Sequence, residues 1–177
     1  GASCEVTLSG PLVRRRLGSD SELAGFVVRA EVLHLSRSVT FTGPTYERAA
    51  GGGHQGIVTS QRLGGSMQLH YARVDNCGRA LLGEYCTHFH WVGECAECRI
   101  VGSVITRGTN KGTTVHGTHG ALLQRNVYYD IRGASIYFEN GQELYNVVER
   151  NVVGCPELSG QGAAPGVTTR CQCIDCV

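Results

Sequence analysis

The sequence lacks the charge pattern and the long apolar runs that mark several common classes of protein. Lysine occurs once, at Lys111, and 16 Lys and Arg residues stand against 15 Asp and Glu residues, for a formal net charge of +1. This balance offers no broad basic surface to nucleic acid or to an anionic membrane. No apolar run approaches the about 20 residues that a membrane-spanning helix needs. We therefore expect no nucleic-acid partner and no membrane insertion by this segment.

Several short motifs of common enzymes are missing as well. The sequence contains no phosphate-binding loop of the Walker type, no nucleophile elbow and no His-Glu-x-x-His zinc motif. A single lysine also speaks against a lysine-based pocket. Only 4 prolines accompany 25 glycines, and glycine at this frequency suits tight turns between short strands better than helices. The composition therefore favours a β-rich chain without a familiar catalytic signature.

Cysteine, in contrast, is abundant, with nine residues in a chain of 177. This number favours disulfides formed in an oxidising compartment over scattered buried thiols. Cys77 and Cys86 flank a loop, and Cys95-x-x-Cys98 falls in a turn. The disulfide candidates are Cys77, Cys86, Cys95, Cys98, Cys155, Cys171, Cys173 and Cys176. Their pairing stays open, and the odd total predicts one free thiol or a partner outside the chain. A zinc site formed by Cys95, Cys98 and the C-terminal cysteines is the alternative.

Four strand-like segments repeat from residue 66 onward. They read QLHYARVDN, CRIVGSVIT, ALLQRNVYY and YNVVERNVV, and they align on Val74, Val104, Val127 and Val152, which lie 30, 23 and 25 positions apart. A second apolar triplet follows about ten residues later. A repeat of about 20 to 30 residues with strand-type content and no helical period is typical of a solenoid. Two or three short strands per turn predict a parallel β-helix, whose coils stack at about 4.8 Å.

Two other folds have similar patterns. Leucine-rich repeats share the period, but their leucine and asparagine spacing is absent. An immunoglobulin-like sandwich supplies as many strands, yet it would not place Asn126 and Asn151 at the same point of successive repeats. We predict that these asparagines either stack as a ladder at a coil corner or serve as ordinary turn residues.

The chain divides by pattern into three segments. Residues 1–25 are predicted to be an N-terminal strand segment, 26–154 the coils of the β-helix, and 155–177 a Cys-rich C-terminal tail. The chain begins at Gly1 without Met and stops inside that tail. We therefore expect it to be a fragment of a larger protein.

Several motifs resemble those of a known family. THFHWVG at residues 87–93, TVHGTHG at 114–120 and the YFENG box at 137–141 are similar to the β-helix repeats of the G8-domain, fibrocystin-like proteins. That family includes cell-surface and secreted hyaluronan-depolymerising proteins. The resemblance implies a right-handed, pectin-lyase-like parallel β-helix in an extracellular or cell-surface protein. Three positions depart from the family pattern, since Arg16 and Ala134 replace common histidines and Asn140 replaces an aspartate. No G8 domain is recognisable in the chain.

The histidines provide the candidate site. In a strand, His88 and His90 point to the same face. His116 follows His90 by about one coil and Glu139 follows His116 by another, so the three residues are predicted to form one column on the solenoid wall. Side chains in such a column could share a metal ion or relay a proton. We predict His90 or His116 as the acid or base of a catalytic site, with Glu139 or Asp130 as its partner. In the alternative, the histidines stack structurally inside the solenoid or at its corners.

A ligand-binding role is predicted for His88, His119, Trp91 and Arg107 around this column. We expect no cofactor, with calcium as the alternative, and the identity of any bound metal stays open. Burial of the column would favour a scaffold role, and exposure would favour an enzyme.

Three functions follow as expectations. The first is a non-catalytic extracellular module of a large fibrocystin-like protein, acting in adhesion, assembly or matrix and glycan binding. The second is an enzyme that depolymerises hyaluronan or another acidic glycan, which the absence of a basic groove does not favour. The third is a structural subunit of an extracellular filament, because exposed strand edges invite pairing. The expected partners are other domains of the parent protein, extracellular glycan and neighbouring subunits.

Overall fold

The computed structural model of the chain describes residues 7, 10, 19–21, 26–28, 32–43, 56–60, 65–155 and 172–176, with the backbone alone for 19–21, 26–28 and 172–176. The chain divides into two compact units, Gly1–Val32 and Leu33–Val177. Every regular element of the described residues is a β-strand, which confirms the predicted all-β class. No helix in this part of the chain is long and apolar enough to cross a bilayer.

The first unit contains one described hairpin. Strand β1, Ser19–Ser21, pairs antiparallel with β2, Phe26–Val28. The predicted start of the coils at residue 26 coincides with the first residue of β2, whose described partner is β1. The segment boundaries proposed from the sequence stay predictions.

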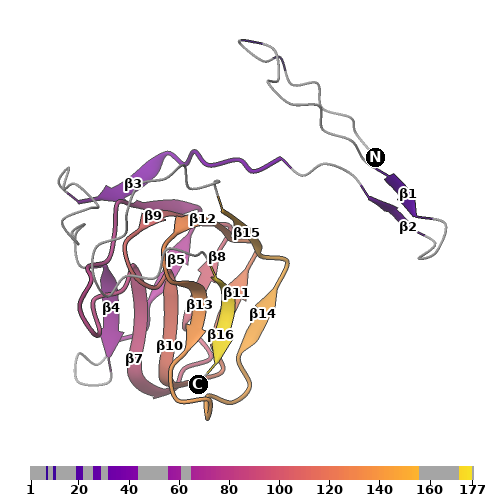
Figure 1. The fold of residues 1–177 in the computed structure, drawn as a ribbon. Helices are drawn as coiled ribbons and strands as arrows, with labels where there is room; N and C mark the ends of the chain where they lie inside the picture. The colour runs from indigo at the N-terminus through magenta and orange to yellow at the C-terminus, as the bar shows by residue number, and fades with distance from the viewer. Residues whose placement is uncertain are drawn as a thin grey trace. The chain divides into compact units, whose positions relative to one another are not determined.

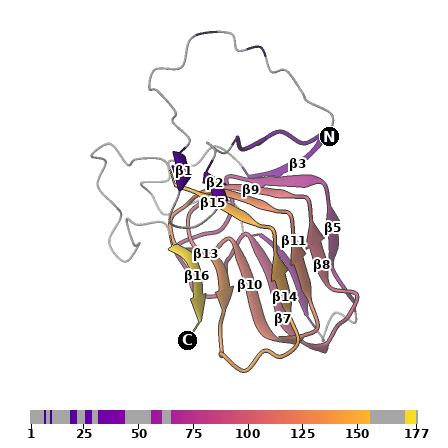
Figure 2. The ribbon, with the colours of Figure 1, turned by 90° about the vertical axis from the view of Figure 1, so that its right-hand side faces the viewer.

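Three parallel sheets form the second unit (Figures 1 and 2). The first sheet contains, in spatial order, β3 (Val39–Thr42), β6 (Ala72–Asp75), β9 (Val104–Gly108), β12 (Val127–Ile131) and β15 (Val152–Gly154). The second contains β5 (Gln68–His70), β8 (Arg99–Val101), β11 (Leu122–Gln124) and β14 (Val147–Glu149). The third contains β4 (Ile57–Ser60), β7 (Thr87–Glu94), β10 (Thr113–His119), β13 (Ala134–Phe138) and β16 (Gln172–Cys176).

The order of the strands shows how the chain winds. Each turn of the chain adds one strand to the second sheet, then one to the first and one to the third, as β8, β9 and β10 do. Val127 lies between Val104 and Val152 on neighbouring strands, all in parallel register. Strands stacked in this way pair their backbones with the coils on either side at a spacing of about 4.8 Å. The predicted parallel β-helix is therefore confirmed.

The interior of the solenoid is filled by side chains that alternate along the strands. Phe89 on β7 and Val115 on β10 are adjacent in register and fully buried, and Phe138 on β13, in register with Val115, packs against the same core. Ile100 and Leu123 fill the interior from the second sheet in the same way. Burying one such side chain stabilises the fold by about 1.5 to 3 kcal/mol. The core is thus a set of stacked rows, one residue per coil.

Stacked asparagines occupy one corner of the coils, as one of the two sequence interpretations predicted. The backbone N–H of Asn126 donates to Oδ1 of Asn151 at 2.9 Å, and the N–H of Ser103 donates to Oδ1 of Asn126 at 2.9 Å. Asn126 Nδ2 donates to the Ile100 carbonyl at 2.8 Å. The preceding residue, Arg125, has φ of 55°, which turns the chain sharply. The asparagine side chains therefore satisfy backbone groups that the turn leaves outside the sheets.

One predicted alignment was wrong by a residue. Val104 pairs with Arg73, and Val74 pairs with Ile105. β9 contains two adjacent apolar residues, Val104 and Ile105, either of which could face Val74, so matching valines by identity could not determine the register. The N–H of Ala72, which donates to Ser103 Oγ at 3.3 Å, helps to hold the observed register.

Two disulfides lie within the described coils. Cys77 is bonded to Cys86 and Cys95 to Cys98, which confirms disulfide formation at these four candidates. The alternative zinc site is wrong for Cys95 and Cys98, because their bonded sulfurs provide no thiolates. Cys155 is a free, exposed thiol. The side chains of the three C-terminal candidates lie outside the described residues.

Candidate functional site

The outer face of the third sheet carries a row of polar side chains from three successive coils. His116 on β10 pairs in register with His90 on β7, and the N–H of Glu139, just after β13, donates to the Val115 carbonyl at 3.0 Å. Alternate side chains of a strand point to opposite faces. Because Phe89 and Val115 face the interior, the histidines face outward. The structure therefore places His90, His116 and Glu139 in one row outside the solenoid core.

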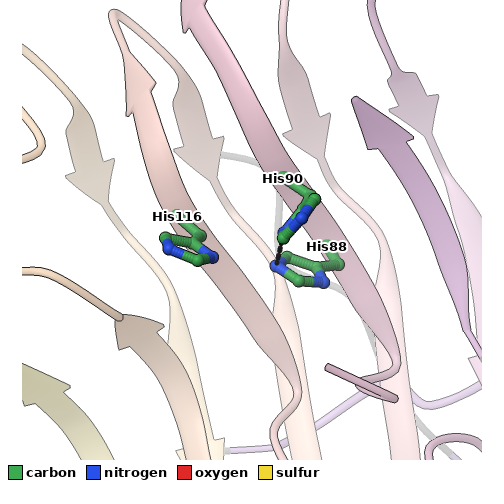
Figure 3. Close-up of side chains that lie close together, drawn as sticks. All are labelled: His88, His90 and His116. Atoms are coloured by element: carbon green, nitrogen blue, oxygen red, sulfur yellow. Dashed lines mark hydrogen bonds between the residues drawn. The ribbon is translucent and has the colours of Figure 1, made fainter. Parts of the chain in front are cut away.

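His88 joins this row from β7, and together His88, His90 and His116 form the histidine cluster (Figure 3). His88 Nε2 and His90 Nδ1 lie 3.3 Å apart. The His116 ring is nearly parallel to that of His88, with centroids 6.0 Å apart, and its centroid is 5.0 Å from that of His90. One ring nitrogen of each histidine lies within 4.8 Å of the other two. This spacing suits a shared proton or a shared metal ion.

A disulfide-closed loop covers one side of the histidine cluster. The loop is bounded by Cys77 and Cys86 and contains Gly83 and Tyr85. The Gly83 carbonyl lies 3.3 Å from His88 Nδ1, and the Tyr85 and His88 ring centroids are 4.9 Å apart. His88 is consequently only 3% exposed, although it lies on the outer face.

Burial has a clear effect on the protonation of His88. Burial, together with repulsion from the imidazolium charges of the neighbouring His90 and His116, lowers the pKa of His88 from 6.5 to about 4. The Gly83 carbonyl opposes this change only in part. The imidazole of His88 is therefore neutral at pH 7, the form that binds metals.

Glu139 contributes a carboxylate to the edge of the cluster. Its Oε1 accepts a hydrogen bond from the Tyr85 hydroxyl at 3.3 Å. Burial, together with the Glu139 charge, raises the pKa of Tyr85 to about 12. Glu139 Oε2 lies 3.2 Å from His116 Nδ1 and 3.8 Å from His88 Nε2. Although the first pair is within ion-pair distance, neither Oε2 nor His116 Nδ1 has a well-aligned hydrogen bond in the described structure.

Trp91 extends this face toward solvent. Its indole is 52% exposed, and its ring centroid lies 4.6 Å from that of His116. Trp91 and Gly117 have φ values of 51° and 52° at equivalent points of successive coils. The indole lies over Gly117, where a Cβ would come within 2.3 Å of Trp91 Cε3, so only glycine fits there. The Gly117 N–H donates to Glu143 Oε1 at 3.0 Å, which holds this corner in place.

Three other residues predicted for the site have different surroundings. His119 ends β10, and its Nδ1 accepts the N–H of Leu144 at 2.9 Å. Arg107, on β9, forms an ion pair with Asp75, and Asp130 lies on the neighbouring strand β12. Both strands belong to the first sheet, whereas the histidine cluster lies on the third. The structure therefore does not bring Arg107 or Asp130 to the histidines.

Sequence reasoning missed three residues of this region. Gly83 and Tyr85 contact the histidine cluster from the loop. The carboxylate of Glu143 accepts hydrogen bonds from three backbone N–H groups, those of Gly117, Asn140 and Gln142. These hydrogen bonds outweigh burial and lower the pKa of Glu143. The position of Tyr85 directly before Cys86 was the available signal, because a closed loop between two coils must pack against the nearest sheet.

The fold and the disulfides define this part of the chain as a parallel β-helix module. Residues 50–161 match the family model described as the CEMIP beta-helix. The chain therefore belongs to the CEMIP beta-helix family.

Curated relatives agree with this assignment. The chain is 29% identical to human Fibrocystin-L over 187 residues, which cover 83% of the chain and 4% of Fibrocystin-L. It is 30% identical over 142 residues to Protein rliB of Dictyostelium discoideum, covering 80% of the chain and 12% of that protein. It is 26% identical over 147 residues to the human Cell surface hyaluronidase CEMIP2, covering 72% of the chain and 10% of CEMIP2.

These matches confirm the resemblance to the G8-domain, fibrocystin-like family. The chain spans 4 to 12% of the length of these three relatives. No solved structure matches the chain.

Proposed function

We propose that this chain is a non-catalytic β-helix module of a large cell-surface or secreted protein, and that it binds extracellular glycan through the outer face of β7 and β10. The observation that carries this proposal is the exposed indole of Trp91. Its position over Gly117 and beside His116 leaves one broad aromatic face open to solvent. The apolar face of a sugar ring packs well on a rigid indole, while the nearby imidazoles can hydrogen-bond its hydroxyls.

Two further observations support an extracellular module. The Cys77–Cys86 and Cys95–Cys98 disulfides are stable in an oxidising compartment and rare in the cytosol. The name of CEMIP2 places that relative at the cell surface. Since the chain corresponds to a small part of long relatives, its first partners are the other domains of its parent protein.

A hyaluronan-depolymerising enzyme is the second candidate. The histidine cluster with Glu139, and the name hyaluronidase carried by CEMIP2, favour it. Against it, hydrolysis of a glycosidic bond generally uses two carboxyl groups about 5 to 9.5 Å apart. Of the carboxylates predicted to act here, Glu139 lies at the cluster and Asp130 lies on another sheet. We therefore favour binding over cleavage.

The test of binding is titration calorimetry with oligosaccharides of hyaluronan and of other acidic and neutral glycans. We expect Trp91→Ala to weaken binding by about tenfold or more, which is about 1.4 kcal/mol. Tyr145→Ala is the matched control, because Tyr145 is 81% exposed and belongs to no strand of the third sheet. Equal loss in both variants, or no binding by the native chain, would contradict the proposal.

The size of hyaluronan chains after incubation with the protein, with and without calcium, separates binding from cleavage. Shortening of the polymer that disappears in His116→Gln would establish the enzyme instead. A constant polymer length with retained binding supports the module.

A further inference from the structure

We infer that His88, His90, His116 and Glu139 form a binding site for one divalent transition-metal ion of the zinc type on the outer face of the third sheet. The inference does not rest on glycan binding, since it concerns only the geometry of these four side chains.

The separations between the histidine nitrogens suit a small ion. Two donors bound tetrahedrally to zinc at about 2.0 to 2.1 Å lie about 3.3 Å from each other. His88 Nε2 and His90 Nδ1 are 3.3 Å apart. One nitrogen of each of the three histidines lies within 4.8 Å of the other two, so rotation of the His116 ring would bring the third donor to the ion. His116 is only partly buried, with 14% of its side chain exposed.

Two atoms without hydrogen bonds point to the same place. His116 Nδ1 and Glu139 Oε2 are buried, lie 3.2 Å apart and have no hydrogen-bond partner in the described part of the chain. Glu139 Oε2 also lies 3.8 Å from His88 Nε2. Buried polar atoms normally have partners, and a bound ion is one of the explanations for two adjacent atoms that lack them. A metal ion would satisfy both atoms at once.

The surrounding groups orient the donors. If His88 Nδ1 carries the proton and donates to the Gly83 carbonyl at 3.3 Å, Nε2 keeps its lone pair. That lone pair accepts a hydrogen bond from His90 Nδ1 at 3.3 Å in this structure, and the ion would take the place of this hydrogen bond. The Tyr85 hydroxyl donates to Oε1 of Glu139 at 3.3 Å, which leaves Oε2 for the ion. Hydrogen bonds of this kind to the outer atoms of metal ligands are typical of protein metal sites. The loop that supplies them is closed by Cys77 and Cys86.

The donor types select the class of ion. Three imidazole nitrogens and one carboxylate oxygen suit zinc, copper, nickel or cobalt, whereas calcium and magnesium prefer oxygen donors alone. The charge of Glu139 also offsets half of the charge of a divalent ion, which lowers the cost of placing it on a partly buried surface. At this cluster the donor set therefore favours a nitrogen-preferring ion over calcium, the alternative considered from the sequence.

The first experiment uses the full chain without an affinity tag, after treatment with a chelator and its removal. Zn²⁺ is titrated by calorimetry, and Co²⁺ is followed by the visible absorption that distinguishes tetrahedral from octahedral coordination. We expect one ion per chain and a tetrahedral cobalt spectrum, with no comparable binding of Ca²⁺ or Mg²⁺. Imidazole ¹⁵N spectra of the native chain should shift for three histidines on addition of Zn²⁺. No binding, or spectral changes at other histidines, would overturn the inference.

Variants provide the second test. His90→Gln and His116→Gln should weaken Zn²⁺ binding at least about 100-fold, and Glu139→Gln about 10-fold to 100-fold. His70→Gln is the matched control, because His70 is exposed on β5 in the second sheet. Circular dichroism of each metal-free variant shows whether it is folded, and the native-chain spectra decide the question if a variant is not. Zn²⁺ binding that survives in the folded double variant of His90 and His116 would show that the ion binds elsewhere.

Discussion

The hydroxyl of Tyr85 donates a hydrogen bond of 3.3 Å to Glu139, a residue two coils away along the solenoid. Tyr85 belongs to the loop closed by Cys77 and Cys86, and Glu139 follows β13. This one contact ties the loop to the far edge of the histidine cluster. It also explains why a loop that leaves the coils still covers His88.

Removing the hydroxyl should therefore loosen the loop. We expect Tyr85→Phe to lower the free energy of unfolding by about 1 kcal/mol, because one side of the Glu139 carboxylate loses its donor. Urea unfolding under non-reducing conditions measures this change. Tyr145→Phe should have no effect, since Tyr145 is 81% exposed. An equal change in the two variants would show that the hydrogen bond contributes nothing.

The Cys77–Cys86 disulfide should stabilise the folded chain. Replacing both cysteines by serine should cost about 2 to 4 kcal/mol, because the unfolded chain regains the freedom of the closed loop. It should also make His88 more accessible, which a rise of its pKa measured by NMR would report. Cys155→Ser, which removes an exposed free thiol, is the control and should leave stability unchanged. A double variant as stable as the native chain would refute this role.

The asparagine corner provides a test of the solenoid itself. Asn126 is fully buried. Its side chain accepts a hydrogen bond from the N–H of Ser103 and donates one to the carbonyl of Ile100. We expect Asn126→Ala to destabilise the chain by about 2 to 3 kcal/mol, because it leaves buried backbone groups without partners. Asn140→Ala, at an exposed position, should change stability by less than about 0.5 kcal/mol. Thermal or urea unfolding compares the two, and similar losses would contradict a special role of the corner.

Stability should also depend on pH through His88. Its pKa is about 4 in the folded chain, against the ordinary value of 6.5 expected for the unfolded chain, so between these values the unfolded chain binds a proton that the folded chain does not. Stability is therefore fully present above about pH 6.5 and falls as the pH drops toward 4, by on the order of 3 kcal/mol. The groups that face His88 are His90, His116, Glu139 and Tyr85.

Urea unfolding of the metal-free chain between pH 4 and pH 7 measures this dependence. His88→Gln should flatten the pH profile in this range, while His70→Gln should retain it, since His70 is exposed. A native profile that the His88 substitution leaves unchanged would assign the effect to other groups.

Much of the fold could be predicted because a solenoid repeats. The distance in sequence from one coil to the next determines which residues become neighbours, so His90 and His116 could be placed side by side from their numbers alone. The stacked Asn126 and Asn151 follow from the same argument. The repeat period cannot fix the register where adjacent residues are both apolar, as Val104 and Ile105 are. For this reason Val74 was aligned with Val104, one residue away from its true partner Ile105.

The surroundings of the cluster could not be predicted in the same way. A repeat length says that two residues occur in one coil but not which of the three sheets each occupies. Arg107 and Asp130 thus belong to the first sheet, although they are near the histidines in sequence. The cover formed by Gly83 and Tyr85 depends on how a loop outside the repeat folds back.

By itself, the sequence determined the all-β class, the parallel coils, the use of disulfides and the row of His90, His116 and Glu139. These properties depend on side-chain alternation and on a nearly constant coil length, both of which are local. Only the tertiary structure decided that His88 is buried on an outer face, that Tyr85 reaches Glu139, and that Asp130 is remote from both. These contacts depend on which sheet each segment joins and on how a loop outside the repeat folds back. The repeat length specifies neither, so the tertiary structure was needed to find them.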